Sequence, residues 1–83
     1  MTDAQILEAM TDIFRQIFDD DSIVLTPSTV ANDIPDWDSM NHVSIVVAAE
    51  ARFGVKFLTA EIEQLKNVGD FVALIRKKLG PAA

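Results

Sequence analysis

Cysteine is absent from this 83-residue sequence, and glycine and proline occur only three times each. The absence of cysteine excludes disulfides and thiolate metal sites, so the chain fits a reducing compartment. No apolar run approaches the ~20 residues that a membrane-spanning helix needs. Residues 1–4 show no basic segment leading into an apolar one, so we expect no secretory signal. These absences predict a cytoplasmic protein that does not insert into membranes.

Basic residues are also scarce, because seven lysines and arginines stand against thirteen acidic residues, for a net charge of -6. A nucleic-acid-binding protein needs the opposite balance, with a basic patch that releases counterions. The basic run 76–78 is placed near the end of a predicted helix, where positive charge complements the helix dipole. We therefore expect no nucleic-acid partner, and we expect protein partners with basic surfaces instead.

Apolar residues make up 49% of the chain, which is enough for one small core. A chain of this length buries only roughly 60% of its unfolded surface. The sequence therefore predicts a single domain over residues 1–83, with a short tail from about residue 80. Such a core leaves little room for a deep catalytic pocket.

The spacing of the apolar residues predicts an all-α fold, an antiparallel bundle of three longer helices and one short third helix. The first helix follows Thr2 and Gln5, whose spacing is typical of a capping box, and it ends in the acidic run 19–21. From residue 19 to residue 38 no helical period survives and prolines interrupt the chain, so we expect a long loop with a functional role.

Three helices are expected after this loop. The second runs from residue 38 or 39 to residue 53, and Gly54 follows its end. The third is short, with Thr59 as its N-cap and an end at about Leu65. The fourth lies between an N-cap at Asn67 and a stop at Gly80.

The second helix carries apolar residues on two sides, whereas a surface helix normally carries one apolar stripe. At about 100° per residue, one set should face the core. That set is Ile45, Val46, Ala49 and Phe53. The other set is Met40, Val43 and Val47, which cluster near Ser39. Either both sides are buried in the bundle or the second set forms a docking patch for partners, and we favour docking.

The start of this helix suggests a modification site. Asp38 can cap the helix, which leaves the Ser39 hydroxyl in the first turn and facing solvent. A phosphate attached to Ser39 would lie near free backbone N–H groups and the positive end of the helix dipole. Asp-Ser is also an ordinary helix start, so these two residues alone are weak evidence.

The wider context resembles the acyl carrier protein family in order and spacing, over about residues 3–79. The segments that carry the resemblance are Asp38-Ser39-Met40-Asn41-His42-Val43, Phe53-Gly54-Val55-Lys56-Phe57, Glu61-Ile62 to Leu65, and Asn67-Val68-Gly69-Asp70-Phe71. The resemblance implies that a phosphopantetheinyl transferase attaches 4′-phosphopantetheine from coenzyme A to Ser39. It also implies that acyl-activating and acyl-transferring enzymes act on thioesters held by this arm.

The same resemblance suggests roles for further residues. Asp36 and Asp38 would attract the transferase, although Asp38 would serve equally as a plain helix cap. The expected docking residues are Asp36, Trp37, Met40, Val43, Val47 and Glu50, and Trp37 either contacts a partner or covers the junction of loop and helix. The expected acyl cavity involves His42, Ile45, Ala49, Ile62 and Leu65, with His42 half-buried and neutral near its entrance.

The sequence departs from the family pattern on the second helix. Met40 replaces the usual leucine, and the helix is almost neutral where family members commonly carry several acids. The Trp-Asp-Ser-x-x-His pattern looks like specialised stand-alone carriers of secondary-metabolite or polysaccharide pathways.

Other functions remain open at this point. Ser39 and His42 are three residues apart, as in a catalytic pair, but no Gly-x-Ser-x-Gly turn or oxyanion loop accompanies them. We therefore expect no catalytic residue, and no metal site. An aminoacyl or peptidyl carrier, or an unmodified helical adaptor, are the alternatives to an acyl carrier, and we expect a monomer in each case.

Overall fold

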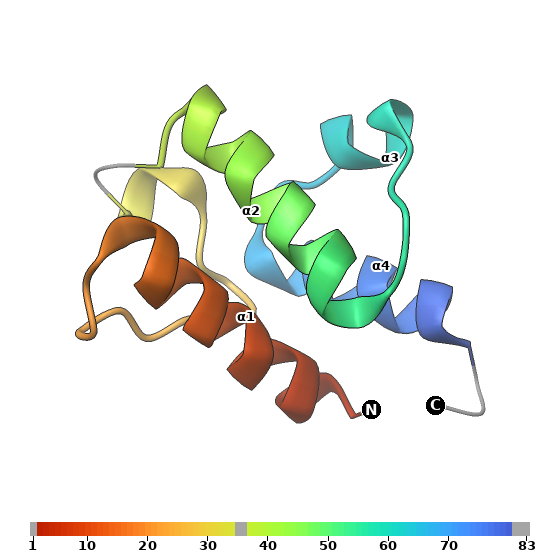
Figure 1. The fold of residues 1–83 in the computed structure, drawn as a ribbon, viewed down its shortest axis with the longest axis horizontal. Helices are drawn as coiled ribbons and strands as arrows, with labels where there is room; N and C mark the ends of the chain where they lie inside the picture. Colours follow the sequence, from red (N-terminus) through yellow and green to blue (C-terminus); the bar gives the residue numbers. More distant parts are fainter. Residues whose placement is uncertain (1, 35–36, 81–83) are drawn as a thin grey trace.

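The computed structural model describes residues 2–34 and 37–80, which contain four α-helices, one short 3-10 helix and no strand. The elements in chain order are α1 (Asp3–Phe18), η1 (Ala31–Asp33), α2 (Ser39–Phe53), α3 (Thr59–Glu63) and α4 (Val68–Leu79). Helices α1 and α2 run in opposite directions (Figure 1). The predicted all-α fold, with three longer helices and a short third one, is confirmed.

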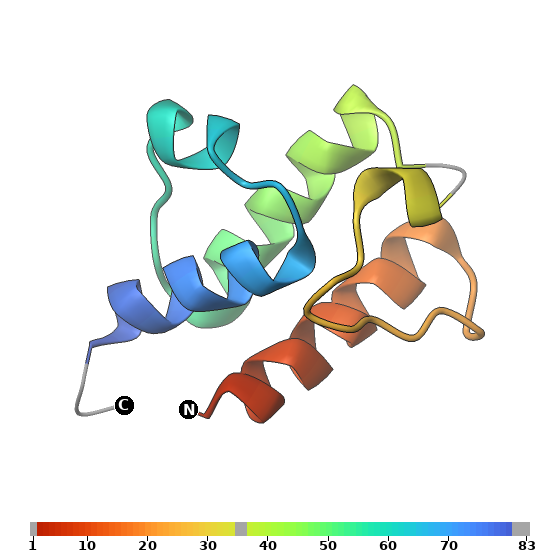
Figure 2. The ribbon, with the colours of Figure 1, turned by 180° about the vertical axis from the view of Figure 1, so that it is seen from behind.

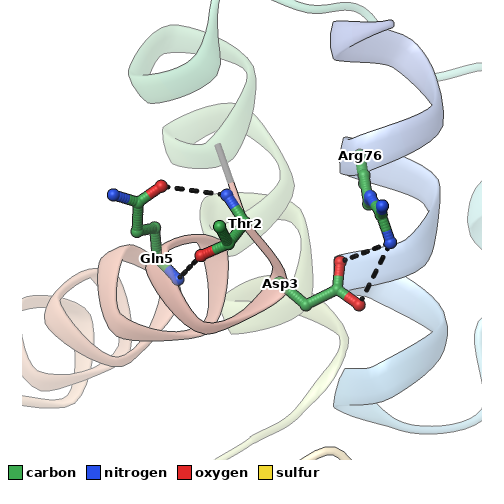
Figure 3. Close-up of polar contacts among 4 residues, drawn as sticks. All are labelled: Thr2, Asp3, Gln5 and Arg76. Atoms are coloured by element: carbon green, nitrogen blue, oxygen red, sulfur yellow. Dashed lines mark hydrogen bonds and ion pairs between the residues drawn. The ribbon is translucent and has the colours of Figure 1, made fainter. Parts of the chain in front are cut away.

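The capping box predicted for α1 is present (Figure 3). Thr2 Oγ1 accepts a hydrogen bond from the Gln5 backbone N–H at 3.2 Å, and Gln5 Oε1 accepts one from the Thr2 N–H at 2.9 Å. At the other end, Asp19 adopts a left-handed conformation with φ 50° and closes the helix. Two of the N–H groups at the start of the helix are thereby satisfied, and the chain turns sharply into the long loop.

The prediction for the third helix was wrong at both ends. Leu58, not Thr59, is the N-cap: it offers no side-chain acceptor, and the Glu61 N–H is satisfied instead by the Leu58 carbonyl at 3.0 Å, while Glu61 Oε1 accepts the Leu58 N–H at 2.8 Å. The helix ends at Glu63 rather than near Leu65. Its last turn tightens into i to i−3 hydrogen bonds, among them the Leu65 N–H to the Ile62 carbonyl at 3.1 Å.

The long loop also contains a 3-10 helix, η1, which the sequence had not predicted. Three residues make a single 3-10 turn, which is too short for any periodicity to mark it. Asp33 Oδ2 accepts the Val30 N–H at 3.0 Å and stabilises this turn. The loop is therefore ordered locally before the chain enters α2.

The core is built from one face each of α1, α2 and α4, with Leu25 and Ile34 contributed by the loop. The apolar residues of α2 that were expected to face the core are all buried: Ile45, Val46, Ala49 and Phe53. Arg15 of α1 also donates from Nε to the Ile23 carbonyl at 2.8 Å. The loop is thus fixed to the bundle by apolar burial and by a hydrogen bond to α1.

The loop is also joined to the start of α4, beside which it passes in Figure 2. The Val68 N–H donates to the Thr29 carbonyl and the Gly69 N–H to the Pro27 carbonyl, each at 2.8 Å. These bonds satisfy N–H groups that the first turn of a helix leaves free. They fix the position of α4 relative to the loop that leads into α2.

At the far end of α4, Arg76 pairs with Asp3 at 3.4 Å (Figure 3). Both side chains are exposed, so the pair adds little stability, but it places the start of α1 beside the last turns of α4. None of the helices described here is long and apolar enough to cross a membrane.

Candidate functional site

The start of α2 presents Ser39 to solvent. Asp38 is extended, and its Oδ1 accepts the Asn41 N–H at 2.8 Å, so Asp38 is the N-cap. Ser39 is the first helical residue and is exposed. The remaining N–H groups of this turn and the helix dipole favour a negative charge at this point. The Ser39 hydroxyl is therefore well placed to carry a phosphodiester.

Trp37 covers the junction between the loop and the bundle. Its ring meets Phe14 of α1 edge-on, with centroids 4.9 Å apart, and stacks on the His42 imidazole with centroids 5.9 Å apart. The indole N–H donates to His42 Nδ1 at 3.2 Å. The side chain is half-buried, so a partner contact by Trp37 remains a prediction.

His42 is half-buried, one turn into α2 from the cap. Desolvation lowers its pKa below the ordinary value of 6.5. Because Nδ1 accepts the Trp37 N–H, the imidazole is neutral with its proton on Nε2. The Nδ1 atom is thus already engaged by Trp37.

A small apolar pocket of about 160 Å³ opens beside Asp38, between the starts of α2 and α4. It is lined by Trp37, Asp38, His42, Leu65, Lys66, Asn67 and Phe71. Lys66, Asn67 and Phe71 had not been predicted as site residues, although Asn67 was predicted as the N-cap of the fourth helix. Only the tertiary contact between the two helix starts brings them to the site.

The residues predicted to form an acyl cavity lie at different depths. His42 and Leu65 line the pocket, whereas Ile45 and Ala49 are fully buried in the core and do not line it. Ile62 is partly buried and packs against the core. The structure thus brings two of the five residues to one pocket, and the role of the whole set toward an acyl chain stays a prediction.

The second apolar set of α2 is exposed. The exposed fractions are 81% for Met40, 61% for Val43 and 57% for Val47. Burial of both sides of the helix in the bundle is thereby excluded. These three residues form an apolar patch along the outer side of α2, called the α2 patch below.

The two acidic residues predicted for docking are Glu50 and Asp36. Glu50 Oε2 accepts the Phe57 N–H at 2.9 Å, so its carboxylate holds the segment after α2. Asp36 lies outside the described residues. Within residues 2–34 and 37–80, no group of three acidic or histidine side chains is placed to hold a metal ion.

No family model matches this chain, but curated proteins are similar to it over most of its length. An acyl carrier protein of Acidothermus cellulolyticus is 35% identical over 71 residues, which are 86% of this chain and 84% of the relative. One from Thermotoga maritima is 39% identical over 61 residues, 74% of each chain. The meromycolate extension acyl carrier protein of Mycobacterium tuberculosis is 31% identical over 77 residues, 93% of this chain and 67% of the relative.

A solved structure also has a similar fold. The solution structure of a holo acyl carrier protein from Geobacter metallireducens is 54% identical, with a TM-score of 0.84, and the match covers 89% of this chain and 85% of that one. The chain therefore belongs to the acyl carrier protein family. Its function is to hold acyl groups on 4′-phosphopantetheine, and an exposed serine at a capped helix start fits the phosphate of that group.

Proposed function

We propose that the 4′-phosphopantetheine arm is attached to Ser39 and that the chain presents acyl thioesters on this arm to separate enzymes. The observation that carries the proposal is the exposure of Ser39 as the first residue of a helix capped by Asp38. A phosphodiester on Ser39 would lie at the positive end of the helix dipole without entering the core. The chain itself would not catalyse a reaction.

This division of work agrees with the surroundings of Ser39. Attachment needs a metal ion, coenzyme A and a base in line with the hydroxyl, and a transferase would supply all of them. The carrier would supply an accessible hydroxyl on a rigid helix end. Asp38 would contribute its cap and its negative charge, and Asp36 would add a second charge toward the transferase.

We further propose that the α2 patch is the surface that partner enzymes contact. An enzyme acting on an arm at Ser39 must approach the start of α2, and Met40, Val43 and Val47 lie along that approach. The patch is apolar, and the nearby Glu50 carboxylate is engaged by the Phe57 N–H. Contact would therefore depend on apolar burial more than on ion pairs. This fits acyl-activating and acyl-transferring enzymes of a specialised pathway in the cytoplasm.

The acyl chain would enter the bundle by the pocket between α2 and α4. Its walls are mostly apolar, and His42 and Leu65 are among the residues that line it. A longer chain would displace the packing around Ile45 and Ala49, with Ile62 at the side. Shielding the chain in this way would remove apolar surface from water.

Attachment at Ser39 is tested by intact mass after incubation with coenzyme A, Mg²⁺ and a broad-specificity phosphopantetheinyl transferase. The wild type should gain one phosphopantetheine and Ser39→Ala none. Ser44→Ala is the matched control, because Ser44 is also exposed on α2 and donates only to the Met40 carbonyl, at 3.3 Å. This variant should be modified like the wild type.

Two results would count against the proposal. Addition to Ser39→Ala would place the arm on another residue. No addition to a folded wild type, beside a control carrier that is modified, would favour an unmodified adaptor that acts through the α2 patch.

A further inference from the structure

The chain has one tryptophan and one histidine, which flank Ser39 in the sequence and contact each other. Trp37 directly precedes the cap residue Asp38, and His42 lies in the first turns of α2. Trp37 also touches α1 through Phe14. The hydrogen bond from Trp37 Nε1 to His42 Nδ1 therefore ties the last residues of the loop to both α1 and α2.

This hydrogen bond exists in only one protonation state of His42. An indole N–H is a donor only, so the imidazole must accept through an unprotonated Nδ1. Once the ring is charged, both nitrogens carry protons and neither accepts. Protonation of His42 thus removes the acceptor of Trp37 and leaves two donors facing each other at 3.2 Å.

We propose that His42 is a positioning residue for the modification of Ser39, acting by holding Trp37 so that Asp38 stays in its capping position. The Asp38 carbonyl accepts the His42 N–H at 2.9 Å, so the pair and the cap share one turn of backbone. The loop enters α2 at a fixed angle while Trp37 is held. The inference rests on the proposed attachment at Ser39.

The surroundings of His42 keep it neutral near pH 7. Desolvation lowers its pKa. Two ionisable residues line the same pocket, Asp38 on its own helix and Lys66 from the segment before α4. Their charges act in opposite directions on the imidazole. The neighbours from α1 and α4 carry no charge: they are Phe14, which packs on Trp37, and Phe71, which lines the pocket.

The consequence is a carrier whose modification weakens as His42 becomes charged. Loss of one hydrogen bond corresponds to about a fivefold fall in kcat/KM. We expect the fall to appear mainly as a higher KM for the carrier, because fewer molecules present Ser39 correctly. The transferase has a pH dependence of its own, so the test needs an internal reference.

His42→Asn provides that reference, because its Oδ1 stands near the position of Nδ1 and accepts a hydrogen bond without titrating. The ratio of wild-type to His42→Asn kcat/KM, measured by intact mass, should be near one at about pH 8 and fall, by up to about fivefold, as His42 becomes charged at acidic pH. His42→Leu fills similar space without an acceptor and should be about fivefold worse than His42→Asn throughout. The fluorescence of the single tryptophan should change with pH in the wild type as His42 becomes charged, and should not change in His42→Asn.

Each result separates the possibilities. Superimposed pH profiles for the wild type and His42→Asn would overturn the positioning role while leaving the attachment at Ser39 intact. Equal kcat/KM for His42→Leu and His42→Asn would overturn it as well, since shape alone would then suffice. Failure of all variants to be modified would overturn the attachment itself, and this inference with it.

Discussion

Replacing Gly69 by alanine sets two effects against each other. Gly69 is a helical residue in the first turn of α4, so helix propensity alone predicts that alanine stabilises the protein by up to about 1 kcal/mol. A Cβ at this position would, however, lie 2.8 Å from the Pro27 carbonyl oxygen, closer than real contacts allow. The neighbour is backbone and cannot rotate away, so the loop and α4 must separate.

The separation would weaken two hydrogen bonds. These are the bonds from the Gly69 N–H to the Pro27 carbonyl and from the Val68 N–H to the Thr29 carbonyl. Each is worth about 1 kcal/mol, and more if the group is left buried without a partner, as at the buried Thr29. After subtraction of the propensity gain, we expect a net destabilisation of about 1–2 kcal/mol. For a domain of this size, each kcal/mol lowers Tm by about 4–8 °C.

Urea denaturation followed by circular dichroism measures this difference directly. Gly54→Ala is the control: nothing lies within 4 Å of its Cβ, but its φ of +67° is left-handed. That variant should lose about 1–2 kcal/mol through backbone strain alone. In Gly54→Ala the pocket lined by Trp37 and Asp38 should stay intact. Gly69→Ala should also change the fluorescence of Trp37. A Gly69→Ala protein as stable as the wild type would refute the reasoning.

Further changes test the site. Asp38→Ala should lower the free energy of unfolding, measured in urea, by about 1 kcal/mol, whereas Asp38→Asn should keep the cap and the stability. If Asp38→Asn is nevertheless modified more slowly, the difference isolates the effect of the charge. Because the pKa of His42 is lowered from 6.5, the unfolded chain binds a proton before the folded one does as the pH falls. The wild type should therefore lose stability below about pH 6.5 relative to His42→Asn, and equal losses would contradict this. The double substitution Met40→Ser and Val43→Ser should raise the KM of modification about tenfold, because the α2 patch would bury less apolar area against the transferase. An unchanged KM would contradict the role proposed for the α2 patch.

Sequence reasoning was most successful where the signal is local. The capping box of Thr2 and Gln5 and the left-handed Gly54 depend on a few neighbouring residues, so the ends of α1 and α2 were predicted correctly. The same rule misled at Thr59, because a hydroxyl is one of several ways to satisfy a helix start. Here the cap is Leu58, one residue earlier, and its carbonyl accepts the Glu61 N–H.

The contacts of the site were harder to predict, because they join residues from different elements. Trp37 belongs to no periodic segment, so its position between Phe14 and His42 could not be read from spacing. The docking role of Glu50 stays a prediction, and the hydrogen bond that its carboxylate accepts from the Phe57 N–H was not predicted. A signal did exist, since every buried N–H needs a partner and the turn at Gly54 brings the two residues together.

The contact between Asp3 and Arg76 has a practical consequence. It gathers the start of α1 and the last turns of α4 on one side, and both views show the start of α2 on the opposite side (Figures 1 and 2). A tag, a fusion partner or a solid support joined near either of those helix ends would leave Ser39 facing outward. The carrier should therefore be usable in immobilised form, loaded and unloaded by enzymes in the surrounding solution.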